Sequence, residues 1–98
     1  MSVVKFTEVA RELNIAEGRD YRLREIYINS AHVVLMREDD HSLRLLSEDR
    51  LPSGLDKRQR FTRILLQKGS SGQEVVVVGQ PELVEKKLFA VDKKILRG

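Results

Sequence analysis

The sequence predicts a β-rich α+β domain with four to five mostly antiparallel strands and a C-terminal helix, and a small SH3-like barrel is one arrangement of those strands. Three observations favour this class. Two apolar segments flank a glycine-containing connection, two further segments flank a polar corner, and a helical pattern follows a proline. At 98 residues the chain has room for a single domain, residues 1–98.

The clearest strand pair comprises residues 60–67 and 74–78, which are joined by the polar connection 68–73 and predict a hairpin. The second strand contains four consecutive valines, Val75 to Val78. Successive side chains of a strand point to opposite faces, so both of its faces are apolar. Burying one valine contributes about 1.5 kcal/mol or more. The run therefore predicts cover on both faces, by a helix, by a second subunit or by curling of the sheet.

The N-terminal half contains two further strand signals. Residues 3–6 open with strand-type side chains, whereas residues 7–13 fit either a strand or a helix and residues 16–22 are polar, as in a loop. Residues 23–28 then predict a strand, Asn29-Ser30 a corner, and residues 31–36 a second strand.

Residues 38–59 are predicted to form a charged loop or insertion, with a short strand at residues 43–46 as an alternative. The net charge is only +3, but acidic side chains concentrate in residues 38–49 and basic ones in residues 50–68. One interpretation is a contact surface for a charged partner. The other is that the two blocks face each other or are simply solvated.

The C-terminal helix is predicted to begin at Pro81, because proline suits the first helical position and Glu82 suits the positive end of the helix dipole. Its apolar stripe comprises Val84, Leu88, Val91 and Ile95. The pattern is firm to about Phe89, and residues 90–98 are expected to be a frayed tail.

No side chains in the sequence form a recognisable catalytic, metal or cofactor site, so we expect a protein that is not an enzyme, needs no cofactor and has no small-molecule substrate. The chain has no cysteine, which excludes disulfides and thiolate chemistry. Asp39, Asp40 and His41 match no metal geometry and are interpreted as a turn. The N-terminus does not resemble a signal peptide and no apolar run reaches membrane-spanning length, so we expect a cytoplasmic protein without a membrane partner.

A basic cluster offers one specific alternative function. Nucleic-acid binding would use its cations on phosphates, with Phe61 stacked on a base. The competing interpretation is that Phe61 belongs to the core and that the cations solvate a strand edge. The cluster comprises Lys57, Arg58, Arg60, Arg63 and Lys68.

The segment from Arg24 to Val34, with Ile28-Asn29 at the end of its first strand, resembles the core of the small bacterial FlbD-like family, which is associated with flagella and swarming motility. The order of the other short motifs agrees along most of the chain: Phe6-Thr7, then Glu38-Asp39-Asp40, then Pro81-Glu82-Leu83-Val84. Extra residues near 10–22 and the charged insertion near 40–59 depart from the pattern. The resemblance implies a compact β-rich module without catalytic residues.

These observations together predict a small non-catalytic binding or regulatory module that acts through protein–protein contacts and associates with itself. Self-association is expected because the valine run needs cover on its second face. Nucleic-acid binding through residues 57–68 is the alternative.

Overall fold

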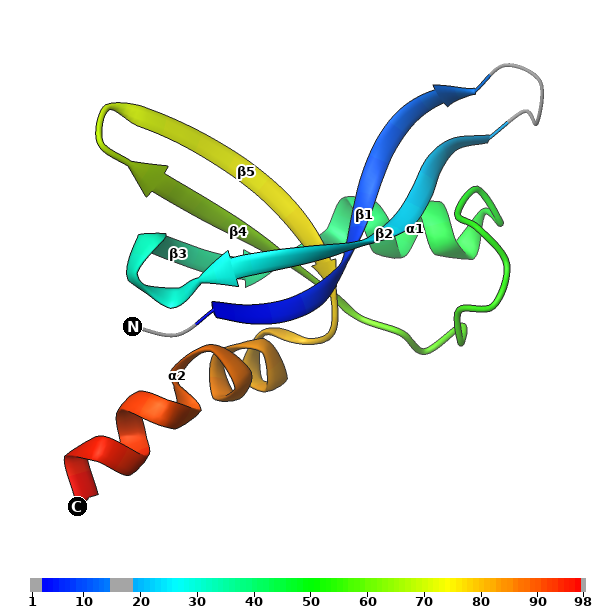
Figure 1. Cartoon of the computed structure of the whole chain (residues 1–98). Helices are drawn as coiled ribbons and strands as arrows, with labels where there is room; N and C mark the ends of the chain where they lie inside the picture. Colours follow the sequence, from blue (N-terminus) through cyan, green and yellow to red (C-terminus); the bar gives the residue numbers. More distant parts are fainter. Residues whose placement is uncertain (1–2, 15–18, 98) are drawn as a thin grey trace.

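The computed structural model describes residues 3–14 and 19–97 (Figure 1). In chain order the elements are β1 (Val3–Asn14), β2 (Arg19–Asn29), the 3₁₀ helix η2 (Ser30–His32), β3 (Val33–Glu38), α1 (Asp40–Ser47), β4 (Phe61–Lys68), β5 (Ser71–Val78) and α2 (Pro81–Arg97). The five strands form one antiparallel sheet. The predicted β-rich α+β class with a C-terminal helix is therefore confirmed.

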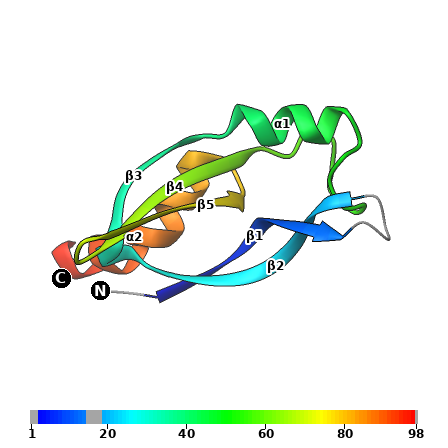
Figure 2. The ribbon, with the colours of Figure 1, turned by 90° about the horizontal axis from the view of Figure 1, so that it is seen from above.

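The sheet has the strand order β2-β1-β5-β4-β3, and it consists of two ribbons that cross. The β1–β2 pairing is unbroken from Val3, opposite Asn29, to Arg11, opposite Tyr21. In contrast, β1 meets β5 at the single register pair Glu8 and Val77. Figure 2 shows the β1–β2 ribbon on one side and β3, β4, β5 and α1 on the other. Strands β2 and β3 are the two edges, so the described strands form an open sheet and not a closed barrel.

Two hydrophobic cores flank the crossing, and each takes side chains from both ribbons. Core 1 is closed by α2 and comprises Phe6, Ile28, Ile64, Val75, Val77, Val84 and Leu88. Core 2 is closed by α1 and the following loop and comprises Val9, Leu45, Leu51 and Phe61. The two helices lie at different ends of the molecule (Figure 1).

The four valines of β5 divide between these cores. Val75 and Val77 are buried in core 1, whereas Val76 and Val78 pack against core 2. The predicted cover on both faces is therefore present within one chain, from α2 on one face and from α1 with its loop on the other. Consequently, this strand no longer supplies a reason for self-association.

Residues 7–13, for which the sequence allowed a strand or a helix, are strand. Three other local predictions in the N-terminal half and the hairpin need correction. Residues 19–22, predicted as loop, belong to β2, which pairs with β1; residues 16–18 lie outside the described part. Residues 31–32 lie in η2, because the Asn29 side chain accepts a hydrogen bond from the Ala31 amide and caps that turn. The connection between β4 and β5 is also shorter than predicted, since the strands pair down to Lys68 and Ser71.

The prediction of a loop or short strand within residues 38–59 is wrong for residues 40–47, which form α1. Asp39 caps this helix, because its carboxylate accepts a hydrogen bond from the Ser42 amide at 3.1 Å. Leu45 is buried in core 2, so α1 is stabilised both by its cap and by the burial of this side chain.

Helix α2 begins at Pro81, as predicted, and buries Val84 and Leu88. The helix extends to Arg97. The structure does not describe the side chains of Val91 and Ile95, and it does not describe Gly98. The prediction of a frayed tail is therefore still a prediction.

Candidate functional site

The five residues of the predicted nucleic-acid site do not line a common hollow. Arg58 and Arg60 line a hollow near the start of α2, and Arg63 lines a smaller one with Glu74. Lys68 lines a third hollow near the turn between β4 and β5, and Lys57 lines none of the three. The sequence cluster is therefore divided among separate places.

All three arginines in this cluster have acidic neighbours. Arg60 donates a hydrogen bond to Glu38, Arg63 Nη2 lies 2.8 Å from Asp39, and Arg58 Nε lies 3.3 Å from Asp56. Arg63 also lies 3.4 Å from Glu74. The interpretation that the acidic and basic blocks face each other is confirmed for Glu38 and Asp39.

Asp39 is the buried member of this network. Burial by itself opposes its ionisation, but hydrogen bonds from Ser42 and the charge and hydrogen bonds of Arg63 outweigh that effect and hold the pKa of Asp39 below its ordinary value. Its backbone N–H also donates to the Phe61 carbonyl at 3.0 Å. Asp39 therefore joins α1 to β4 and serves the structure, not the turn that the sequence predicted.

Two more accessible carboxylates, those of Glu38 and Asp56, also have lowered pKa values. The hydrogen bond from Arg60 lowers the pKa of Glu38, and the backbone and side-chain hydrogen bonds from Arg58 lower the pKa of Asp56. The pKa of Arg60 is in turn raised by Glu38. Each pair is thus fully charged near neutral pH and largely self-compensated.

Phe61 is completely buried in core 2, with 0% of its surface exposed. Base stacking needs an exposed ring face. The prediction that Phe61 belongs to the core is therefore confirmed, and its proposed stacking role is wrong.

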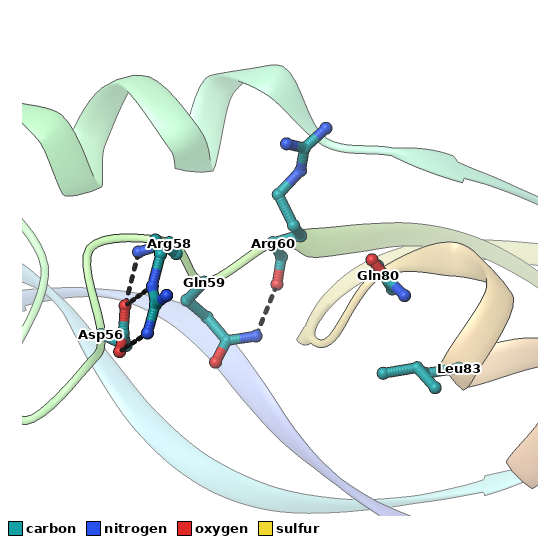
Figure 3. Close-up of a pocket in the computed structure, with 6 residues that line it drawn as sticks. All are labelled: Asp56, Arg58, Gln59, Arg60, Gln80 and Leu83. Atoms are coloured by element: carbon teal, nitrogen blue, oxygen red, sulfur yellow. Dashed lines mark hydrogen bonds and ion pairs between the residues drawn. The ribbon is translucent and has the colours of Figure 1, made fainter.

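We call the first hollow the loop hollow. It has a volume of about 350 Å³ and is lined by Asp56, Arg58, Gln59, Arg60, Gln80 and Leu83 (Figure 3). Asp56 and Arg58 pair with each other on one side, and the Arg60 side chain points away from the hollow towards β3 (Figure 3). Its one apolar wall is Leu83. The loop hollow therefore offers little uncompensated charge to a ligand.

The other large hollow, which we call the mouth hollow, lies where the corner between β2 and β3 faces the tip of the β4–β5 hairpin. Its volume is about 460 Å³. It is lined by Tyr27, Ile28, Asn29, His32, Leu66, Gln67, Lys68, Ser71, Gly72 and Gln73. Of the predicted site residues, only Lys68 contributes to it. The sequence did not predict this hollow, because its lining comes from two segments, residues 27–32 and 66–73, that are far apart in the chain.

Within the described part of the chain, no group of three His, Cys, Asp or Glu side chains is placed to hold a metal ion. Asp39 caps α1, and Asp40 and His41 begin that helix. A helix able to cross a bilayer is likewise not found among the described residues.

The two edges of the sheet differ, a feature that the sequence analysis did not identify. The edge strand β3 has six residues and an irregular register between Val33 and Leu35. The edge strand β2 has eleven residues and pairs regularly from Tyr21 to Asn29. Tyr27 on β2 is 64% exposed. The sequence signal for this edge is the absence of glycine and proline from residues 19–29.

In comparisons with protein-family models, with curated proteins and with solved structures, nothing matched this chain. The resemblance to the FlbD-like family therefore still depends on the short motifs alone.

Proposed function

We propose that this chain is a non-catalytic protein-binding module that associates with a second copy of itself by pairing the two β2 edges. The observation that supports this function is the β2 edge, which is long, regular and free of bulges between Tyr21 and Asn29. An edge strand presents unpaired backbone N–H and C=O groups, which pair readily with another extended strand.

The contrast between the two edges favours β2 as the contact. Proteins protect free edges by keeping them short, by bulges, by proline and by charge. Strand β3 is short and carries a bulge at Val34, followed by Arg37. Strand β2 is neither short nor bulged between Tyr21 and Asn29. It carries Arg22, Arg24 and Glu25, but Arg24 and Glu25 form ion pairs with Glu8 and Lys5 on the neighbouring strand β1. An edge without such protection is most stable when another strand covers it.

Two copies of β2 can pair with each other in register when a two-fold axis relates them. In an antiparallel pair related by a two-fold axis normal to the sheet, residues opposite each other must share a face. An axis at Arg24 places Tyr21 opposite Tyr27 and Leu23 opposite Glu25. Aromatic cross-strand pairs contribute roughly 0.2 to 1 kcal/mol each.

The two copies of Arg24 would then lie opposite each other. This arrangement is tolerable because each Arg24 Nε lies 2.8 Å from its own Glu8 carboxylate, which compensates the charge. Glu8 is buried at the crossing of the ribbons, so its position is set by the fold.

Light scattering coupled to gel filtration, over a series of protein concentrations, tests this proposal. We expect a dimer whose dissociation constant rises about two- to thirtyfold in Tyr27→Lys, because the substitution removes both symmetry-related aromatic pairs. Val34→Lys on the β3 edge is the matched control, since Val34 is 52% exposed, and it should leave the dimer unchanged. A monomer at several hundred micromolar, or equal effects of the two variants, would contradict the proposal.

Nucleic-acid binding has less support, because three of its arginines are paired with acids and Phe61 is buried. Titrations with duplex and single-stranded DNA and with RNA at two salt concentrations distinguish the two functions. Binding that weakens steeply with salt and is lost in Arg58→Ala would favour the alternative over self-association.

A further inference from the structure

The mouth hollow lies at the open end of core 1. The half-buried Leu66 and the exposed Tyr27 supply its apolar surface, and Ile28, which is 1% exposed, lies beneath them in core 1. A volume of about 460 Å³ is within the usual size of small-molecule sites, roughly 300 to 1,000 Å³. The hollow thus combines an apolar lining with a polar rim.

The lining of this hollow contains a basic residue, Lys68, and no acidic residue. None of its ten lining residues is acidic, although the chain contains 15 acidic residues. Lys68 lines it and forms no ion pair with any described residue. The loop hollow differs in this respect, because Asp56 already neutralises Arg58 there. An anion entering the mouth hollow therefore meets a cation without first displacing a carboxylate.

Two neutral polar side chains of the hollow are engaged within the protein, and two others are exposed and can meet a ligand. The Asn29 side-chain oxygen is engaged by the Ala31 amide at 2.9 Å, and Gln67 donates to the Gly69 carbonyl at 3.4 Å. Ser71 and Gln73 are exposed beside Lys68 and carry donor groups that can turn towards a bound oxygen.

We propose that the mouth hollow binds a small organic carboxylate with an apolar body, in addition to any protein contact at β2. Lys68 meets the carboxylate, and Leu66 and Tyr27 contact the apolar part. The same chemistry is present in a free acid and in the C-terminus of a peptide that ends in an apolar residue.

The test is a titration of the ¹⁵N-labelled full chain, followed by NMR, with 4-phenylbutyrate and with the neutral 4-phenylbutyramide. We expect shift changes centred on residues 27–32 and 66–73 for the acid, and binding about fivefold weaker for the amide, as expected for one partly exposed ion pair. An acetylated Leu-Phe dipeptide with a free or amidated C-terminus distinguishes the peptide source from the free acid.

Lys68→Met should weaken binding of the acid about fivefold and leave binding of the amide unchanged. Lys57→Met is the matched control, because it removes one exposed lysine outside the hollow and should change neither affinity. The inference is overturned if acid and amide bind equally, if the shift changes centre on the loop hollow, or if no saturable binding occurs below 10 mM (about −2.7 kcal/mol). Tyr27 belongs both to the hollow and to the proposed dimer contact, so the titrations use a protein concentration at which light scattering gives one oligomeric state throughout. Lys68→Met leaves the β2 edge unchanged, so failure of the dimer proposal and failure of this inference are distinguishable.

Discussion

Asp39 illustrates how one side chain determines local structure in this protein. Its carboxylate accepts from the Ser42 amide at the start of α1 and from Arg63 on β4. A buried carboxylate is stable only when such donors surround it. The Asp39 carboxylate, which the sequence places in a charged loop, therefore connects α1 to β4.

We expect Asp39→Asn to lower the free energy of unfolding by about 1 to 2 kcal/mol at pH 7, because asparagine still caps a helix but cannot pair with Arg63. The folded-state pKa of Asp39 is lowered, so the folded state binds fewer protons than the unfolded state. Its contribution is present above the unfolded pKa of about 3.9 and is lost as pH falls through the lower folded value. The difference between wild type and variant should therefore shrink below about pH 4.

Urea unfolding at a series of pH values measures this difference. Asp56→Asn is the control, because Asp56 is exposed and pairs with the exposed Arg58, and it should change stability far less than Asp39→Asn does. A difference between wild type and Asp39→Asn that stays constant from pH 7 to pH 3 would show that ionisation of Asp39 does not stabilise the fold.

At the scale of elements, α2 is an integral layer of the domain and not an appended tail. Leu88 is completely buried in core 1, whereas Leu83, one and a half turns earlier, is 51% exposed. Helix stability in proteins comes mostly from such a packed face and less from intrinsic propensity. The same residue type therefore has different energetic roles on one helix.

Leu88→Ala should lower the free energy of unfolding by about 2 to 5 kcal/mol, because it leaves a cavity in core 1. Leu83→Ala, the same substitution on the same helix, should change it by less than about 0.5 kcal/mol. Chemical denaturation of both variants measures the difference. Similar losses for the two variants would mean that α2 is not packed on the sheet as described.

At the scale of the whole molecule, the two crossing ribbons make the cores interdependent. Strands β1, β4 and β5 each contribute to core 1 and to core 2, for example through Phe6 and Val9 on β1 or Ile64 and Phe61 on β4. Neither core can lose its strands without exposing apolar surface of the other. The chain should therefore unfold as one cooperative unit.

Tyrosine fluorescence and far-ultraviolet circular dichroism should consequently report coincident urea transitions, because Tyr21 packs on core 2 whereas the dichroism reports all elements. Phe61→Leu in core 2 and Ile64→Val in core 1 should each shift both transitions together. A fluorescence transition that precedes the dichroism transition would show that core 2 unfolds separately.

Several features of the fold follow from local sequence alone. The alternation of side chains in a strand makes the Val75–Val78 run require two-sided cover, and Pro81-Glu82 marks a helix start. The hairpin of β4 and β5 and the burial of Phe61 follow from the same kind of pattern. These signals are local because each depends on residues within one strand or one helical turn.

Tertiary contacts decided the rest. Helix α1 is only eight residues long and charged, so it forms because Asp39 caps it and Leu45 enters core 2. The first residues of β2 are extended because β1 lies beside them. The residues of the basic cluster line different hollows, and the mouth hollow exists because the corner between β2 and β3 faces the tip of the β4–β5 hairpin. Pairing and burial between distant segments are invisible to local propensity, which is why the chain's own residues indicated the class of fold but not its surfaces.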